Sequence, residues 1–217
     1  MKNLLFLFLF FAGVNLPAQF SAYDPFDDNT NEWITRKDDT AIYEIKDGKL
    51  DMDIKMAGDH LNAKGASVNQ EKLFRTELRT EFKSGDTNTP YGICWGASDL
   101  ENFYTFYITG EGKFGFKLME KGIWKDLLPA IPSATINAKG DNWLRINMVL
   151  AADGKKKMNL VINEEIVRTL DSFFPYGNYF GAYVGGKAKI HFDDFIVYQR
   201  GKTQEEFEPC DLTLSLK

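Results

Sequence analysis

The chain has 217 residues, a formal net charge of −5 and an aromatic content of 14%. A mildly acidic chain without a run of basic residues is not expected to bind nucleic acid, to bind anionic membranes or to insert into a membrane. The length suits a single domain with a sizeable core, in which most of the aromatic side chains are expected to lie.

The first 18 residues have the pattern of a cleavable signal peptide. Lys2 supplies a positive charge, an apolar run ends at Val14, and Ala18 is a small residue at the cleavage position. The run is shorter than the ~20 residues of a spanning helix, and no Cys follows that could carry a lipid. We therefore expect residues 19–217 to form one exported domain, secreted or periplasmic, with a short C-terminal tail. The alternative is an N-terminal anchor that is retained.

The mature chain consists of short runs of aromatic and β-branched residues separated by polar turns. Residues 91–129 give the clearest signal, with Gly-bearing turns between four aromatic runs, as in an antiparallel meander. Asp47-Gly48 is the strongest short hairpin signal. The expected strands, in chain order, are 32–36, 41–46, 49–55, 73–83, 91–97, 103–109, 113–119, 123–127, 142–150, 157–162, 166–170, 178–184 and 189–199.

Two segments are expected to interrupt this series. Residues 57–71 contain Gly58 and Gly65 and are expected to form an irregular loop, while Pro129 and Pro132 are expected to end a strand. With about a dozen strands and no helix of usable length, the sequence predicts an all-β fold of two stacked antiparallel sheets.

The alternation of side chains assigns the two faces of the longest strands. In residues 73–83 the charged side chains share one face, and the apolar and threonine side chains share the other. In residues 142–150, Trp143 is expected to point outward. The last strand changes phase between Phe192 and Phe195, which a β-bulge at Asp193-Asp194 would correct.

Two cysteines, Cys94 and Cys210, remain after cleavage. In an exported protein they could form the one disulfide available, which would join the tail to a central strand. Cys94 is equally suited to a buried strand position as a small free thiol, so both states remain open.

Four sequence segments together resemble the concanavalin A-like lectin/glucanase superfamily, in the branch of laminin G-like and 3-keto-disaccharide hydrolase-type domains of exported bacterial proteins. They are DPFDDNTNEW, YGICWGASDLENFYTFYITGEGKFGF with GIW behind it, NWLRI and IHFDDFIV. The resemblance covers residues 24–198 and implies an antiparallel jelly-roll β-sandwich. It implies carbohydrate as the ligand class by association, because a fold does not fix a function.

The string Arg75-Thr76-Glu77-Leu78-Arg79 resembles a substrate-binding motif of jelly-roll alginate lyases, whose arginines would pair with uronate carboxylates. The histidine and tyrosine strands of those lyases are missing, and His191 is the remaining histidine candidate in a strand. The alternative is that the charged side chains form an exposed face whose members pair across neighbouring strands.

Glu77 and Glu81 also resemble the carboxylate pair of retaining glucanases of the same superfamily. Here Arg79 lies between them, and a guanidinium would keep both carboxylates ionised and remove the acid. No nucleophile–base pair, zinc cluster, phosphate loop or dinucleotide fingerprint is found, so no organic cofactor is expected.

A structural calcium site is a further prediction. Asp27 and Asp28 near the start, with Asp193 and Asp194 at the expected bulge, resemble the chain-end acids that bind Ca²⁺ in many jelly rolls. The alternative is that these acids cap turns and accept backbone hydrogen bonds.

Aromatic side chains are the candidates for a sugar-stacking surface, because Trp and Tyr combine a flat apolar ring with a polar group. Trp143 is the strongest of them, since its strand directs it away from the core. The full set is Trp95, Tyr104, Tyr107, Trp124 and Trp143, with Tyr176 and Tyr179 as rim residues.

The sequence thus favours an exported carbohydrate-binding domain without clear catalytic machinery. A glycan-active enzyme, either a glycosidic-bond hydrolase or a polysaccharide lyase, is the first alternative. A structural or adhesion domain is the second.

Overall fold

The structure is a computed structural model that describes residues 23–69, 72–200, 207–209 and 212–216. The predicted signal peptide, residues 1–18, and Cys210 lie outside these ranges. The described residues form 17 strands and no helix, which confirms the all-β prediction. Nothing in the described part of the chain is a helix long and apolar enough to cross a membrane.

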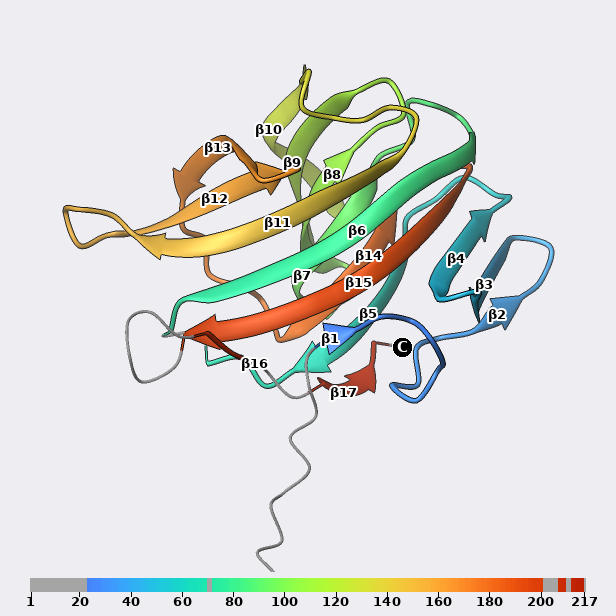
Figure 1. Cartoon of the computed structure of the whole chain (residues 1–217), viewed down its shortest axis with the longest axis horizontal. Coiled ribbons are helices and arrows are strands. Elements are labelled where there is room, and N and C mark those ends of the chain that lie inside the picture. The colour runs from blue at the N-terminus through green and yellow to red at the C-terminus, as the bar shows by residue number, and fades with distance from the viewer. Residues whose placement is uncertain (1–22, 70–71, 201–206, 210–211, 217) are drawn as a thin grey trace, which may run out of the picture.

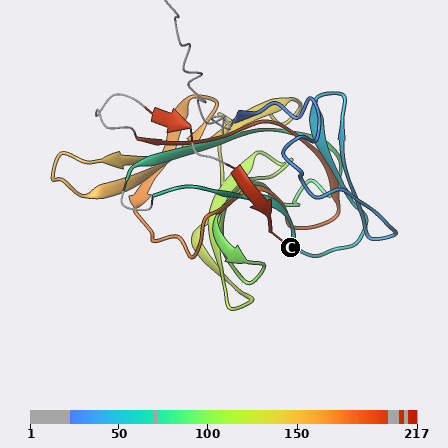
Figure 2. The same ribbon diagram turned by 90° about the horizontal axis from the view of Figure 1, so that it is seen from below.

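The strands form two antiparallel sheets, seen one in front of the other in Figure 1 and as two layers in Figure 2. The first has ten strands, of which β1 (Tyr23–Asp24) and β16 (Phe207–Pro209) both pair with β15. The other eight, in spatial order, are β13 (Glu165–Asp171), β12 (Lys156–Ile162), β11 (Asp141–Leu150), β6 (Phe74–Gly85), β15 (Ala188–Arg200), β4 (Lys49–Ile54), β3 (Ala41–Lys46) and β2 (Arg36–Lys37).

The second sheet has seven strands among the described residues. In spatial order they are β10 (Ile123–Pro132), β9 (Lys113–Glu120), β8 (Asn102–Ile108), β7 (Tyr91–Asp99), β14 (Tyr179–Val184), β5 (His60–Ala66) and β17 (Leu212–Ser215).

The main core lies between the two sheets and follows from the period-two pattern. On β6, Phe74, Leu78 and the two threonines between them and beyond are buried, as predicted, whereas Arg75 and Arg79 face outward. β11 pairs with β6 in the register Leu144↔Leu78, which places the apolar residues of both strands on the same inner face. Burial of this surface, at roughly 25 cal/mol per Å², is the main force that holds the sheets together.

The predicted bulge in the last strand is confirmed. Asp193 pairs with Arg79 and Ile196 with Glu77, so two residues of β15 face one residue of β6. Asp194 adopts a φ of 49°, a left-handed conformation that Asp tolerates better than most residues. The extra residue restores the phase, and the apolar side chains on both sides of the bulge are fully buried.

Residues 57–71 contain a strand that the sequence did not predict. Residues His60–Ala66 form β5, which pairs with β14 on one side and β17 on the other. The segment is built from small and polar residues, including Asn62 and Gly65, which have low β propensity. Its position between two paired strands, and not its own composition, makes it extended.

Three further boundaries differ from the prediction. β10 runs through Pro129 and Pro132, which an edge strand allows because one side of its backbone has no partner. The predicted strand 32–36 is mostly irregular, and only Arg36–Lys37 pairs. The predicted C-terminal tail contributes one short strand to each sheet.

Candidate functional site

The charged face of β6 is a set of paired groups. Glu77 is only 4% exposed, and its Oε1 lies 2.7 Å from Nε of Arg75 and 3.0 Å from Nε of Arg145. Arg145 also contacts the exposed Glu164. A carboxylate held between two guanidinium groups is stabilised in its ionised form and is poorly suited to donate a proton.

Arg79 is likewise engaged on every side that the structure describes. Its Nε lies 3.4 Å from Oδ2 of Asp194, and its Nη1 lies 3.8 Å from Oδ2 of Asp193. The guanidinium carbon lies 5.2 Å from the ring centre of Trp143, within cation–π range. The indole that the sequence placed on an open outer surface is therefore covered by a cation.

Glu81 and His191 complete this face. Nδ1 of His191 lies 3.8 Å from Glu81, and Nε2 lies 3.5 Å from Asp51. Burial lowers the pKa of His191 below its ordinary value of 6.5. Glu81 also contacts Lys49 and Lys83. The five predicted catalytic residues thus lie together, but as the alternative reading described them, with their charges paired across neighbouring strands.

The four acids of the predicted calcium site do not form a metal centre. Asp28 accepts the backbone N–H of Thr30, and Asp194 accepts the hydroxyl of Tyr23 at 2.7 Å. That hydrogen bond, together with burial, raises the pKa of Tyr23 to about 12. Asp27 is exposed and Asp193 contacts Arg79. Among the described residues, no three His, Cys, Asp or Glu side chains come close enough to hold a metal ion.

The predicted aromatic candidates separate into core and surface. Trp95 is fully buried and stacks on Phe74 at 5.7 Å, so it cannot contact a sugar. Tyr104 is also buried and stacks on Tyr176, whose hydroxyl donates to Glu120. Tyr179 is half-buried against the outer cluster of the second sheet.

That outer cluster shows that the seven-stranded sheet is strongly curled. Trp124 lies on β10 and Tyr183 on β14, four strand spacings away, which would be about 19 Å in a flat sheet. Their ring centres are nevertheless only 5.8 Å apart, and Trp124 also lies 5.3 Å from Phe103 on β8. The edge strand β10 therefore folds over the outer face of its own sheet, and Tyr183 is only 1% exposed there.

A single carboxylate fixes the two rings. Asp59, in the turn before β5, accepts the hydroxyl of Tyr183 at 2.7 Å on Oδ1 and the indole N–H of Trp124 at 3.0 Å on Oδ2. Burial, followed by the charge of Asp59, raises the pKa of Tyr183. Both neutral donors hold the half-buried indole in one orientation while Asp59 itself remains exposed.

Lys117 on β9 extends from the same face. Its Nζ lies 4.8 Å from the ring centre of Tyr107 and 5.2 Å from that of Trp124, and no ion pair of Lys117 occurs among the described residues. Its cross-strand neighbour is the exposed Asp126. Tyr107 is buried against Gly115, where a Cβ would lie 2.4 Å from the tyrosine hydroxyl. Burial and the charge of Asp126 raise the pKa of Tyr107 to about 12.

We call these five side chains the curled-face site: Asp59, Tyr107, Lys117, Trp124 and Asp126. It offers an oriented indole, one ammonium and two exposed carboxylates, a combination that can stack on an apolar ring face and hydrogen-bond its hydroxyl groups. The sequence identified Tyr107 and Trp124. It missed Asp59, Lys117, Asp126 and the supporting Tyr183, although the alternation of KFGFKLME places Lys117 opposite the core residues.

Cys94 lies under the same face and is completely buried. Burial raises the pKa of its thiol. Because Cys210 lies outside the described residues, the disulfide between them stays a prediction.

No protein-family model and no curated protein sequence matches the chain. Solved structures match it at low identity. The carbohydrate binding module CBM66 from Bacillus subtilis has a TM-score of 0.54 and 16% identity, over 76% of this chain and 94% of that one. The carbohydrate recognition domain of Emp47p has a TM-score of 0.51 and 13% identity, over 85% of this chain and 96% of that one.

A xylan beta-1,4-xylosidase from Bacillus halodurans also matches, with a TM-score of 0.50 and 16% identity. The match covers 81% of this chain but only 38% of the xylosidase, so the chain spans well under half of that protein. Together with the two antiparallel sheets, these likenesses show a jelly-roll β-sandwich of the concanavalin A-like lectin/glucanase kind, as the sequence predicted.

Proposed function

We propose that the protein is a carbohydrate-binding domain that acts without turnover, and that the sugar binds at the curled-face site. The observation that carries the proposal is the orientation of Trp124 by Asp59, next to a lysine that has no carboxylate partner among the described residues. An indole held in place loses little conformational entropy when a sugar ring stacks on it. Lys117 and the two carboxylates supply directional hydrogen bonds to hydroxyl groups.

Two similar structures support the ligand class. Both CBM66 and the Emp47p domain are described as carbohydrate-binding or carbohydrate-recognising, and this chain covers nearly all of each. The charged face of β6 favours binding over catalysis, because Glu77 and Arg79 are occupied by partners within the protein.

Binding can be tested with a glycan array followed by calorimetric titration of the best ligand. Trp124→Ala is expected to weaken binding by at least about tenfold, as for an aromatic hot spot. Trp143→Ala is the matched control, because each indole is half-buried and has a cation 5.2 Å from its ring. No response across the array would favour the structural or adhesion alternative, and equal loss in both variants would place the ligand elsewhere.

Turnover requires a separate assay. Incubation with alginate and with neutral glucans, followed by measurement of unsaturated uronate absorbance and of reducing ends, is expected to show no product. Product formation that is lost in Glu77→Gln or His191→Gln would establish the enzyme alternative instead.

We also propose that the domain is exported, on the basis of the charge and apolar pattern of residues 1–18. Expression of the full chain in a bacterial host, followed by fractionation and mass determination, should give a product that begins at Gln19 outside the cytoplasm. An uncleaved product in the membrane fraction would support the retained anchor.

A further inference from the structure

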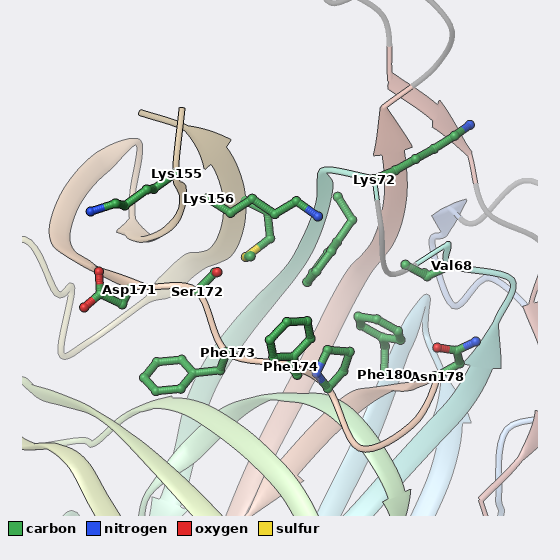
Figure 3. A pocket seen from close by; sticks show the side chains of 13 residues that line it. Val68, Lys72, Lys155, Lys156, Asp171, Ser172, Phe173, Phe174, Asn178 and Phe180 are labelled. Atoms are coloured by element: carbon green, nitrogen blue, oxygen red, sulfur yellow. The ribbon is translucent and has the colours of Figure 1, made fainter. Parts of the chain in front are cut away.

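A pocket of about 450 Å³ opens between the two sheets at one end of the sandwich, away from the curled-face site (Figure 3). It is lined by the starts of β6 and β12, the end of β11, the start of β14 and the loop of residues 172–178. Its volume falls within the range of roughly 300–1,000 Å³ that small-molecule sites occupy. Nothing in the proposed sugar site uses it.

The floor of this pocket is apolar. Phe74 and Phe180 meet edge to face with ring centres 5.7 Å apart, and Trp95 stacks behind Phe74. Met148 and Val68 also line it. A sugar would bury its hydroxyl groups here against rings that offer no hydrogen bond, which costs free energy. The floor therefore favours an apolar ligand body.

The rim is basic, although the chain as a whole is acidic. Of the charged side chains that line the pocket, three are lysines, Lys72, Lys155 and Lys156, and one is an acid, Asp171. Asp171 accepts a hydrogen bond from Lys157 at 2.6 Å, so its charge is already compensated. Lys155 and Lys156 approach from one side and Lys72 from the other (Figure 3). This arrangement favours an anionic group at the mouth.

One wall of the pocket is an anchored loop that exposes an aromatic ring. The backbone N–H groups of Tyr176 and Gly177 donate to the carbonyl of Gly96 at 2.9 and 3.0 Å, and the hydroxyl of Tyr104 donates to the carbonyl of Phe174 at 3.2 Å. Despite these anchors, the Phe174 side chain is 89% exposed at the rim. A ring held over a pocket mouth gains apolar contact when a ligand enters.

From the apolar floor, the basic rim and the anchored Phe174, we infer that this pocket binds a small amphipathic carboxylate, with an alkyl body in the pocket and its carboxylate among the lysines. The inference is independent of sugar binding at the curled-face site.

Octanoate is the probe, and octanol is the matched neutral compound with the same chain length. In a spectrum of [13C-methyl]methionine protein, octanoate should shift the Met148 signal, because Met148 lines the pocket. The Met119 signal, from the outer face of the seven-stranded sheet, should stay in place. Titration should give octanoate a dissociation constant at least about fivefold below that of octanol, with the difference reduced by salt.

Charge reversal at the rim separates this site from nonspecific binding. Lys72→Glu and Lys155→Glu should each weaken octanoate binding and leave octanol binding unchanged, whereas Lys46→Glu, on β3, should change neither. Trp124→Ala should also leave octanoate binding intact. Equal affinities for octanoate and octanol, no effect of either rim reversal, or a shift of Met119 in place of Met148 would overturn the inference. The melting temperature of each variant verifies that it is folded.

Discussion

The outer faces of the two sheets carry different kinds of polar group, although both expose a tryptophan next to a cation. On the ten-stranded sheet, the acids Glu77, Asp193 and Asp194 contact arginines, and Arg79 covers Trp143. On the seven-stranded sheet, Asp59 holds two neutral donors and Lys117 has no ion pair among the described residues.

The difference teaches that a high density of charge does not by itself mark a site. Charges that satisfy one another across neighbouring strands stabilise a sheet face and leave little to offer a ligand. Polar groups arranged around a fixed ring keep their hydrogen-bonding capacity for a second molecule. The comparison therefore assigns stability to the first face and recognition to the second, and each assignment can be tested by substitution.

The largest expected effect is on the ten-stranded face. Glu77→Ala removes a buried carboxylate and leaves Arg75 and Arg145 without their shared partner, so the free energy of unfolding should fall by about 3 kcal/mol. Glu164→Ala removes the exposed partner of the same Arg145 and should cost less than about 1 kcal/mol. Urea unfolding of both variants measures the difference. Equal costs would mean that burial of Glu77 is not what matters.

The next effect concerns the close contact behind the curled-face site. Gly115→Ala places a methyl group 2.4 Å from the hydroxyl of the buried Tyr107, and displacing that ring should cost about 1–3 kcal/mol. Gly110→Ala, whose nearest heavy atom would be 3.3 Å away, is the control and should cost less. Thermal or urea unfolding gives the comparison, and equal stability of both variants would show that Tyr107 can move freely.

Lys117 should affect binding without affecting stability. Because it has no ion pair among the described residues, Lys117→Gln should leave the free energy of unfolding nearly unchanged. The loss of one hydrogen bond from a charged donor, worth about 1.5 kcal/mol, should weaken sugar binding by roughly tenfold. Lys125→Gln, on the neighbouring strand and paired with Glu120, is the control. Unaltered affinity in Lys117→Gln would remove this lysine from the site.

The smallest expected effect is a pH dependence of stability. Burial lowers the pKa of both histidines, His60 and His191, below the ordinary value of 6.5. The unfolded chain therefore takes up these protons first, so the stability is complete above about pH 6.5 and declines as the pH falls through that value towards the folded pKa. His191→Gln should reduce the decline measured by urea unfolding between about pH 7 and pH 5. An unchanged slope would contradict the assigned direction.

Much of this fold is predictable from sequence because alternation is a local signal. The phase of residues 73–83 placed Glu77 and Arg79 on the outer face, and the phase change near Phe195 located the bulge. The same local signals missed β5, whose small residues are extended only because β14 and β17 pair with them. They also misplaced Trp95, which lies next to a register shift in β7 and points into the core.

The site was less predictable than the fold. Asp59 and Trp124 are 65 residues apart and meet only because the seven-stranded sheet curls. That curl brings β10 over β14, and no pattern within either strand specifies it. The sequence could therefore name the ring that would stack on a ligand, but not the carboxylate that orients it.

The central claim, that ligand recognition belongs to the curled face and stability to the other, can be tested in one spectrum. The chain has four tryptophans, and the indole N–H signals of Trp33, Trp95, Trp124 and Trp143 report on four separate places in the protein. In a titration of the 15N-labelled protein with the best glycan from the array, the account predicts that the Trp124 signal shifts and the Trp143 signal stays in place. A shift of Trp143 with Trp124 unmoved would contradict it.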